Sequence, residues 1–240
     1  MIKLHLLCIV FIAATAHSQN IGIGTTSPNS SAILDINAVD KGLLIPRLDT
    51  AQINAIPNPA NGLVVYCTTF GKPVFKNGPD WYFFDGSRMK PFFVGEQYGG
   101  GIVFYVDRSG RHGLIASPTN LSSAKPWGCS GMLIANSSPV LGAGPSNTAS
   151  VSMNCSDSST AAISCELSNI DGYDDWFLPS KDELNLMYQK RNIIGGFISY
   201  YYWSSTEISG SDAWYQNFAD GLQFSTDKAS YLLVRPVRRF

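Results

Sequence analysis

The chain has 240 residues, of which 45% are hydrophobic and 15% charged, and its formal net charge is −1. This balance excludes an intrinsically disordered chain, and it argues against a nucleic-acid partner, because polyanion binding draws on clustered lysine and arginine. The three histidines, His5, His17 and His112, are too few and too scattered for most histidine-based catalytic and zinc sites.

The N-terminus has the pattern of an export signal. Lys3 is followed by an apolar run from Leu6 to Ala14 and then by Ala16-His17-Ser18, a small-x-small site. We therefore predict a signal peptide over residues 1–18 and a secreted or cell-surface location. The alternative, a buried N-terminal helix, is disfavoured because Gly, Ser and Pro follow the short apolar run. No other segment is apolar and long enough to span a membrane, and about 222 residues remain, enough for two compact units.

Five cysteines are present, and Cys8 falls within the signal. The others are Cys67, Cys129, Cys155 and Cys165; an oxidising compartment favours disulfides among them, and four cysteines allow three complete pairings. The last three share one loop-rich region, so we predict one bridge among them, with Cys155–Cys165 as the preferred pair. The absence of a Cys-x-x-Cys spacing and of partner histidines argues against a structural zinc site.

Residues 19–90 are punctuated by Gly, Pro and Asn, and we expect a small β-rich region there. The segment Asp49-Thr-Ala-Gln52 is a capping pattern that predicts one or two helical turns, ended by Pro57. The Asn77-Gly78 pair predicts a hairpin turn. The expected strands cover residues 33–36, 42–45 and 63–66, and the expected hairpin covers residues 74–84.

The residue pattern of the sequence changes at residue 91, and we place the second domain at residues 91–240. We expect it to open with a hairpin whose turn is Arg108-Ser109-Gly110 and whose strands cover residues 101–106 and 114–116. Residues 117–154 are rich in Ser, Gly, Asn and Pro and are expected to form long loops. A short helix is expected at residues 159–167, where apolar side chains recur after one helical turn.

The best local signal in the chain is a helix start at Ser180. Its hydroxyl can cap the amide of Glu183, and acidic side chains in the first turn suit the positive end of a helix. Gly195-Gly196 is expected to end this helix. Aromatic-rich strands are expected at residues 200–205, 213–218, 222–226 and 231–237. This order predicts an α+β domain with two short helices and antiparallel strands.

Four segments near the N-terminus combine Gly, Pro and aliphatic residues: Ile21-Gly-Ile-Gly-Thr-Thr-Ser-Pro28, Ile33-Leu-Asp-Ile36, Lys41-Gly-Leu-Leu-Ile-Pro-Arg47 and Gly62-Leu-Val-Val-Tyr66. Together they resemble the first part of exported bacterial surface proteins with tail-fibre-like stalks. The resemblance covers residues 20–86 and implies a β-rich stalk or spacer that self-associates, with a homotrimer as the expected assembly. The alternative is a small β-domain with no role in assembly.

Six motifs run through the second domain: Gly99-Gly-Gly-Ile-Val-Phe-Tyr105, His112-Gly-Leu-Ile-Ala116, Asp175-Trp-Phe-Leu-Pro-Ser-Lys-Asp-Glu-Leu184, Tyr202-Trp-Ser-Ser-Thr-Glu207, Ala213-Trp-Tyr-Gln-Asn-Phe218 and Val234-Arg-Pro-Val-Arg238. Together they resemble the Lcl-type C-terminal domain family, named for a collagen-like bacterial adhesin, over residues 94–240. The resemblance implies a C-type-lectin-like fold and binding at the cell exterior rather than catalysis. Collagen repeats and a basic excess are absent from this sequence, so glycosaminoglycan binding is not carried over from the founding adhesin.

Some members of this family resemble targets of diversity-generating retroelements, which rewrite adenine-rich codons near the end of a lectin-like fold. Most positions in the segment 208–232 hold residue types that such codons can produce. Trp214, Gln216, Gln223 and Lys228 lie among them and are types that such codons do not produce. The resemblance implies a diversified binding surface, and the alternative is an ordinary loop surface. The expected ligand-binding residues are Ser209, Ser211, Asp212, Tyr215, Asp220, Leu222, Phe224 and Asp227.

Other patterns favour a structural interpretation. Asp171, Asp174 and Asp175 could ligate calcium, but the EF-hand spacing is absent and Asp175 is expected to accept hydrogen bonds from turn amides. A strand, not a helix, is expected after Gly99-Gly-Gly101, so these glycines indicate close backbone approach rather than a phosphate loop. His112 has no orienting partner for a nucleophile among Ser204, Ser205 and Thr206. We therefore predict no enzymatic activity, no cofactor and no metal.

Aromatic and basic side chains near the C-terminus also have structural interpretations. Tyr202, Trp203 and Trp214 are expected to lie mostly in the core, whereas an exposed Tyr215 or Phe224 could stack on a ligand. Arg235, Arg238 and Arg239 are expected to be solvated charges or salt-bridge partners.

The sequence predicts a secreted or surface-displayed, adhesin-like protein, in which residues 19–90 form the stalk and residues 91–240 the binding domain. The expected partner is a glycan or a protein ligand at the cell exterior. The alternative is a structural cap or tip of an envelope or fibre assembly without ligand recognition.

Overall fold

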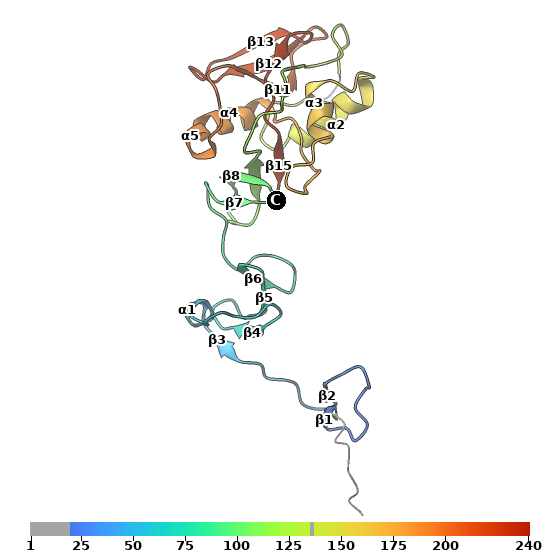
Figure 1. Cartoon of the computed structure of the whole chain (residues 1–240), viewed down its shortest axis with the longest axis vertical. Coiled ribbons are helices and arrows are strands. Elements are labelled where there is room, and N and C mark those ends of the chain that lie inside the picture. The colour runs from blue at the N-terminus through green and yellow to red at the C-terminus, as the bar shows by residue number, and fades with distance from the viewer. Residues whose placement is uncertain (1–19, 135–136) are drawn as a thin grey trace, which may run out of the picture. The chain divides into compact units, whose positions relative to one another are not determined.

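The computed structural model describes residues 20–134 and 137–240 (Figure 1). The predicted signal peptide, residues 1–18, lies outside the described residues. The chain divides into two compact units. The first comprises the chain up to Ile56 together with Val64–Gly71, and the second comprises Pro57–Leu63 and Lys72–Phe240. Each unit is described by itself, and the domain boundary at residues 90 and 91 stays a prediction.

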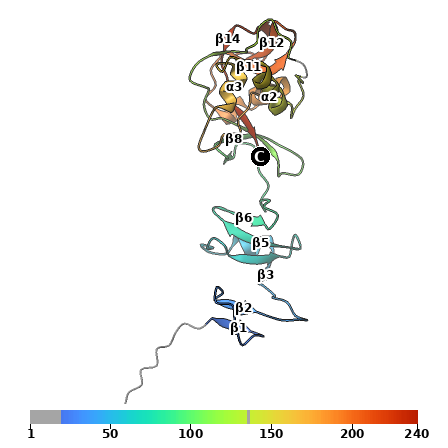
Figure 2. The same ribbon diagram turned by 90° about the vertical axis from the view of Figure 1, so that its right-hand side faces the viewer.

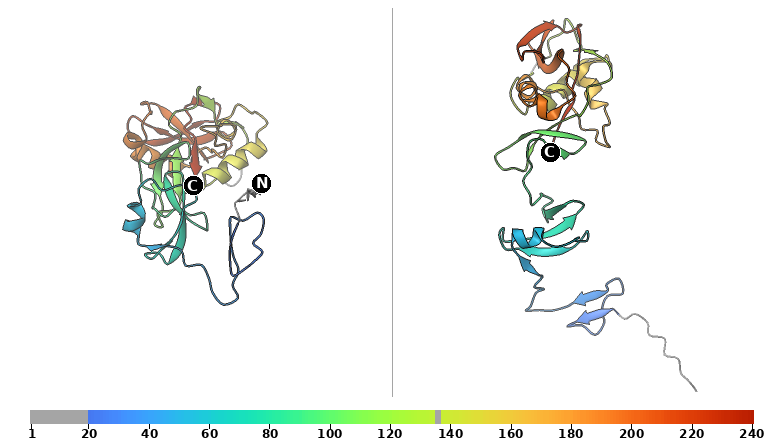
Figure 3. Two further views of the ribbon diagram at one scale, coloured as in Figure 1. Left: turned by 60° about the horizontal axis from the view of Figure 1, so that its bottom comes forward. Right: turned by 60° about the vertical axis from the view of Figure 1, so that its left-hand side comes forward.

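From residue 20 onward, the first unit contains two parallel strand pairs and one short helix. Strands β1 (Ile21–Ile23) and β2 (Leu34–Ile36) pair with Ile21 opposite Leu34, and β3 (Arg47–Leu48) pairs with β4 (Val64–Cys67) (Figure 2). Helix α1 (Thr50–Asn54) lies beside β3 and β4 (Figure 3).

The helix after Asp49 is confirmed, with the capping pattern that the sequence predicts. The Asp49 carboxylate accepts from the Gln52 amide at 2.8 Å, and the Gln52 side chain accepts from the Asp49 amide at 2.9 Å. The strand predicted at residues 42–45 is wrong, because that segment belongs to no strand and Leu43 and Leu44 are exposed. An apolar run gains nothing as a strand where no neighbour pairs with its backbone or covers its side chains.

The first strands of the second unit form the predicted hairpin. Strands β5 (Lys72–Asn77) and β6 (Asp80–Phe83) are antiparallel, with Asn77 opposite Asp80. Gly78 occupies the turn with φ of 55°, a backbone angle that glycine adopts without strain.

A four-stranded antiparallel sheet follows, in the order β15-β9-β8-β7. The Gly99-Gly-Gly101 segment turns from β7 (Gln97–Tyr98) into β8 (Gly101–Val106). A Cβ on Gly101 would lie 2.2 Å from the Ala116 carbonyl oxygen, so the expected close backbone approach is present. The remaining strands are β9 (Gly113–Ala116) and β15 (Val237–Arg239).

A second antiparallel sheet consists of β11 (Tyr201–Glu207), β12 (Asp212–Asn217) and β13 (Gln223–Asp227), in that order. A two-stranded ribbon pairs β10 (Lys125–Pro126) with β14 (Tyr231–Leu232). The single strand predicted at residues 231–237 is therefore wrong. The chain leaves one sheet after Leu232 and enters the other at Val237, just after Pro236, whose backbone has no N–H to donate.

The prediction of two helices in the second domain is also wrong, since the described part of residues 91–240 contains four: α2 (Gly144–Asn154), α3 (Ala161–Glu166), α4 (Lys181–Gln189) and α5 (Arg191–Ile194). Helix α2 lies in the predicted loop region of residues 117–154. Its Gly, Ser and Asn residues are weak helix formers, but burial of Asn147, Thr148 and Val151 stabilises the helix.

The predicted helix start at Ser180 is confirmed. Ser180 and Glu183 form a capping box. This helix, α4, ends at Gln189, and Gly195, with φ of 76°, ends the short α5 that follows.

Two apolar clusters meet across β11. Trp203 lies in a cluster with Trp127 and Leu178 from the side of α2 and α3, whereas Tyr202 lies in a cluster with Phe177 and Leu184 from the side of α4. Successive side chains of a strand point to opposite faces, so β11 is buried on both faces along its centre. The expected core positions of Tyr202 and Trp203 are confirmed, since both are fully buried.

Candidate binding surface

The candidate surface is the sheet β11–β12–β13, whose one face is closed by α4 (Figure 1). The Gln216 side-chain amide donates to the Asn185 side chain at 2.9 Å, and the Gln223 amide donates to the Lys181 carbonyl oxygen at 2.9 Å. The Lys181 ammonium lies 3.6 Å from the centre of the Trp214 ring, which is half-buried. This face is therefore a packed support rather than a surface for ligand.

The opposite face has a row of three aromatic side chains, one from each strand: Tyr201, Tyr215 and Phe224, here called the aromatic row. The ring centres of Tyr201 and Tyr215 are 5.2 Å apart, and those of Tyr215 and Phe224 are 6.1 Å apart. Tyr201 is 39% and Phe224 46% exposed, and Tyr215 between them is half-buried. Buried Trp203 packs edge-on against Tyr215 at 6.4 Å. The row is thus a partly exposed apolar surface on a rigid sheet.

The hydroxyl of Tyr215 is available as a neutral hydrogen-bond donor. Partial burial, followed by the nearby Tyr201 and Asp220, raises the pKa of Tyr215 above its ordinary value of 10.0. A neutral phenol combines an apolar ring with a polar tip, a combination common at binding surfaces.

The polar residues expected to bind ligand mainly organise the turns beside this sheet. Ser209 accepts from the amides of Ser211 and Asp212 at 3.1 and 3.0 Å. Asp220 accepts from the Leu222 amide at 2.9 Å and from the Asn217 side chain at 2.8 Å. These bonds hold the chain between β11 and β12 and between β12 and β13.

Asp227 has a similar role after β13. Its carboxylate accepts from the Ala229 amide at 2.8 Å and from the Ser130 hydroxyl at 3.2 Å. Ser211 and Leu222 are exposed at the surface of the turns. A ligand-binding role for the predicted polar residues stays a prediction; the side-chain oxygens of Ser209, Asp220 and Asp227 already accept hydrogen bonds from the protein.

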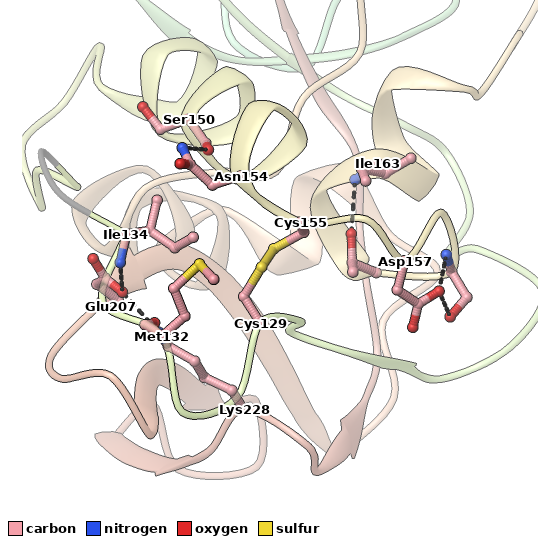
Figure 4. The surroundings of a disulfide bond; sticks show 12 residues. Cys129, Met132, Ile134, Ser150, Asn154, Cys155, Asp157, Ile163, Glu207 and Lys228 are labelled. Carbon is pink, nitrogen blue, oxygen red and sulfur yellow. Dashed lines mark hydrogen bonds and ion pairs between the residues drawn. A yellow bond between two sulfur atoms is a disulfide. The ribbon is translucent and has the colours of Figure 1, made fainter.

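A buried ion pair fixes the loop at residues 129–134 to this sheet (Figure 4). The Lys228 ammonium lies 2.7 Å from a Glu207 carboxylate oxygen, and their side chains are 0% and 5% exposed. The same ammonium donates to the Met132 carbonyl oxygen at 2.9 Å and lies 4.6 Å from the centre of the Trp127 ring. Glu207 also accepts from the Ile134 amide at 3.0 Å. Sequence reasoning missed this pair, whose members are 21 residues apart.

One disulfide forms among the three C-terminal cysteines, as predicted, but the preferred pair was wrong. Cys129 is bonded to Cys155, with 5.5 Å between their Cα atoms, and Cys165 is a free thiol (Figure 4). Cys155 caps the end of α2 beside Gly128, whereas Cys165 lies on the buried face of α3. The bridge fixes the other end of the 129–134 loop. Burial raises the pKa of the Cys165 thiol and keeps it protonated.

Arg235 is not a solvated charge or a salt-bridge partner, contrary to the prediction. Its guanidinium is buried and donates to the Asn120 side chain and to the carbonyl oxygens of Ser117, Gly195 and Gly196. Burial lowers the pKa of Arg235 to about 10. The residue therefore holds three loops together and remains charged at neutral pH.

The other basic and acidic candidates are distributed at the surface. Asp175 accepts two hydrogen bonds from the Arg238 guanidinium, at 2.6 and 3.0 Å, rather than bonds from turn amides. Arg239 donates to the Gly142 carbonyl oxygen. Asp171 and Asp174 are exposed, and in residues 20–134 and 137–240 no group of three or more His, Cys, Asp or Glu side chains could hold a metal ion.

Sequence reasoning missed Tyr201, the third member of the aromatic row. Alternation along β11 shows that Tyr201 and Trp203 share a face. The sequence could not show that β10 and β14 cover Trp203 while Tyr201 stays exposed, because that cover comes from distant segments.

Two regions of the chain match known families. Residues 133–238 match the family described as the Lcl C-terminal domain, and residues 22–97 match the phage tail like trimerisation region. Both resemblances predicted from the sequence are therefore confirmed, and neither family is described as an enzyme.

A fimbrial protein from Bacteroides ovatus ATCC 8483, known from a crystal structure, is similar to this chain with 18% identity and a TM-score of 0.40. The alignment covers 68% of this chain and 48% of that one, so this chain spans less than half of that protein's length. No curated protein sequence matches the chain. Every helix in the described residues is too short or too polar to cross a bilayer.

Proposed function

We propose that this protein is a secreted or surface-displayed adhesin-like protein that binds a glycan or a protein ligand through the aromatic row. The Lcl C-terminal domain match supports a role at the cell exterior, and the C-type-lectin-like fold belongs to the same proposal. Export through a signal peptide at residues 1–18 also belongs to it.

The aromatic row is the observation that carries this proposal. Three adjacent rings stay partly exposed on a sheet whose other face is locked by α4 and whose turns are fixed by internal hydrogen bonds. Aromatic rings on a rigid support bind sugar faces or apolar side chains with little loss of conformational entropy.

The experiment compares ligand binding by the double variant Tyr215→Ala/Phe224→Ala with that by wild type, on a glycan array and on bacterial and host cells. We expect binding to fall at least about tenfold, because removing two central rings forfeits about 1–2 kcal/mol or more. Phe93→Ala is the matched control, since Phe93 is 52% exposed and lies outside the sheet. Wild-type binding by the double variant, or equal loss in the control, would contradict the proposal.

We also propose that the N-terminal segment forms a homotrimer. The match to a trimerisation region supports this assembly. In the β1–β2 pair, Ile21 and Ile23 are 60% and 54% exposed and lie opposite Leu34 and Ile36, which are exposed as well. Alternate residues of paired strands share a face, so these four form an aliphatic surface that further copies would cover.

Light scattering of the purified full chain tests the assembly. Wild type is expected to be a trimer, and Ile21→Asp/Ile23→Asp is expected to shift it to monomers, because each buried aspartate would lack a partner. Lys41→Asp, an exposed charge change outside the β1–β2 pair, is the control. A monomeric wild type, or a double variant that stays trimeric, would refute this interface.

A trimer is also expected under a second candidate function, that of a structural cap or tip that recognises no ligand. The exposed aliphatic face of β1 and β2 favours assembly under either function. A stable trimer that binds no glycan, cell or protein would favour the structural role, whereas binding that depends on the aromatic row would favour the adhesin.

A diversified binding surface is a finer form of the first proposal. None of the eight predicted ligand-binding residues is buried, whereas the interspersed Gln216 and Lys228 are fully buried. Substitution of the exposed Ser211, Leu222 or Phe224 would therefore leave the buried support intact, whereas Ser209, Asp220 and Asp227 also hold the turns through their side-chain oxygens. Sequencing the flanking DNA tests this: a reverse transcriptase and an adenine-rich near-copy of the codons for residues 208–233 would support it, and their absence would indicate fixed specificity.

A further inference from the structure

A cavity that is separate from the aromatic row lies within the second unit. The cavity has a volume of about 430 Å³, and its lining comes from the turn after β6, β7, the turn between β8 and β9, and the C-terminus. None of the aromatic-row residues lines it. Cavities of this size that combine an apolar wall with a few polar groups are typical of small-molecule sites.

The apolar wall consists of aromatic rings packed against one another at tilted angles. The Phe92 ring centre lies 4.6 Å from that of Tyr98 and 4.3 Å from that of Phe240. The Arg88 guanidinium lies 4.5 Å from the centre of the Phe92 ring. Such packing fixes the rings, so the wall is present before any ligand binds.

Two of the three arginines that line the cavity are neutralised by carboxylates. Arg88 forms ion pairs with Asp80 at 3.0 Å and Glu96 at 2.7 Å. Arg238 forms its two bonds with Asp175 and donates to the Gly99 carbonyl oxygen at 2.9 Å. Neither guanidinium needs an added anion.

Arg111, the third arginine, differs from them. Within the described residues its guanidinium donates to the Ser87 hydroxyl at 2.6 Å and has no carboxylate within ion-pair distance. The Asp85 carboxylate also lines the cavity, but it accepts from the Ser87 amide at 2.9 Å and pairs with Lys72 at 3.6 Å. Arg111 therefore keeps N–H donors for an outside anion.

Three tyrosines add neutral donors to this cavity: Tyr82, Tyr98 and Tyr173. In the part of the chain that the structure describes, no hydrogen bond uses any of their hydroxyls. Burial, followed by the nearby Tyr98, raises the pKa of Tyr82, and Tyr173 acts in the same direction. Because all three tyrosines line this cavity, their hydroxyls can serve one ligand together.

We propose that this cavity binds a small carboxylate, with the acid group on Arg111, the polar groups of the body on the tyrosine hydroxyls, and its flat face against the Phe92 and Tyr98 wall. The bidentate geometry of guanidinium and carboxylate gives the acid its specificity. A body of monosaccharide or amino-acid size fits the volume. The site is independent of the proposed binding through the aromatic row.

Ligand-observed NMR titrations of the full chain test this site. The acid probes are glucuronate and hippurate, and their neutral counterparts are glucose and hippuramide. We expect saturable binding of one acid with a Kd of about 1 mM or tighter, and at least about tenfold weaker binding of its neutral counterpart. Binding of glucuronate would identify a sugar acid, and binding of hippurate would identify an acylated amino acid.

Two variants locate the binding. Arg111→Gln should weaken binding of the acid at least about tenfold, whereas Arg108→Gln, an exposed arginine in the same turn that does not line the cavity, should leave it unchanged. Tyr98→Phe removes one hydroxyl and keeps the ring wall, so it should weaken binding even if Arg111→Gln does not fold. Absence of saturable binding of both acids, equal binding of the neutral counterpart, or full affinity in Arg111→Gln would overturn the proposal.

Discussion

The buried pair of Lys228 and Glu207 gives the sharpest prediction. Lys228→Met removes the cation and leaves the Glu207 carboxylate with 5% exposure and, among the described residues, only the Ile134 amide as a hydrogen-bond donor besides solvent. Removing one partner of a buried ion pair destabilises a protein by about 3–5 kcal/mol, because the remaining charge stays desolvated without a counter-charge. The Met132 carbonyl oxygen also loses its donor.

The assay is urea unfolding followed by tryptophan fluorescence, since Trp127 packs directly on the ammonium. We expect Lys228→Met to lower the free energy of unfolding by about 3–5 kcal/mol, or the melting temperature by about 6–20 °C. The double variant Lys228→Met/Glu207→Gln should lose less than Lys228→Met alone, because it leaves no unpaired charge. Lys181→Met, which removes a partly exposed cation from the Trp214 ring, should lose about 1 kcal/mol or less.

A loss below about 1 kcal/mol in Lys228→Met, or a double variant as unstable as the sum of its single variants, would refute the reasoning. Hydrogen exchange adds a local readout. The Ile134 amide donates to Glu207. If this pair fixes the loop, hydrogen exchange of that amide should be faster in Glu207→Gln/Lys228→Met than in wild type.

Three further changes test other parts of the structure. Cys129→Ser should lower the free energy of unfolding by about 3 kcal/mol, and reduction of wild type should give the same loss; no change in either would refute the bridge. Gly221→Ala should be more destabilising than Gly78→Ala by about 1–3 kcal/mol. Both glycines have positive φ, but only the new Cβ at Gly221 would meet an atom, the Tyr188 ring at 2.3 Å. Equal unfolding midpoints of the two variants in denaturant would contradict this. Burial raises the pKa of Glu183, so its stabilising contribution is present below its ordinary pKa of 4.5 and is lost as the pH rises through the raised value. The unfolding free energy of Glu183→Gln minus that of wild type should therefore grow with pH in urea titrations, and a flat or falling difference would be the contrary result.

Local chemistry predicted the parts of the fold that depend on neighbours in sequence. The capping patterns at Asp49 and Ser180 and the hairpin at Asn77-Gly78 are all present. Each follows from a hydrogen bond or a backbone angle available within four residues. Helix α2 escaped prediction because its sequence has low helix propensity, and its stability comes from buried Asn147, Thr148 and Val151, whose partners lie elsewhere in the chain.

The same distinction holds for the candidate surface. The sequence predicted that Tyr215 and Phe224 belong to neighbouring strands and are candidates for contact. Whether Tyr201 or Trp203 completes the row depends on which part of the sheet β10 and β14 cover, and only packing decides that.

By itself the sequence determined the two matched regions, the α+β order of the second and the local turns, because motifs and caps act over short distances. Only the tertiary structure decided that Cys129 reaches Cys155, that Lys228 is buried against Glu207 and that Arg235 is enclosed by carbonyl oxygens. These partners are far apart in sequence, and their pairing depends on the burial that lowers solvent competition for charge and hydrogen bonds.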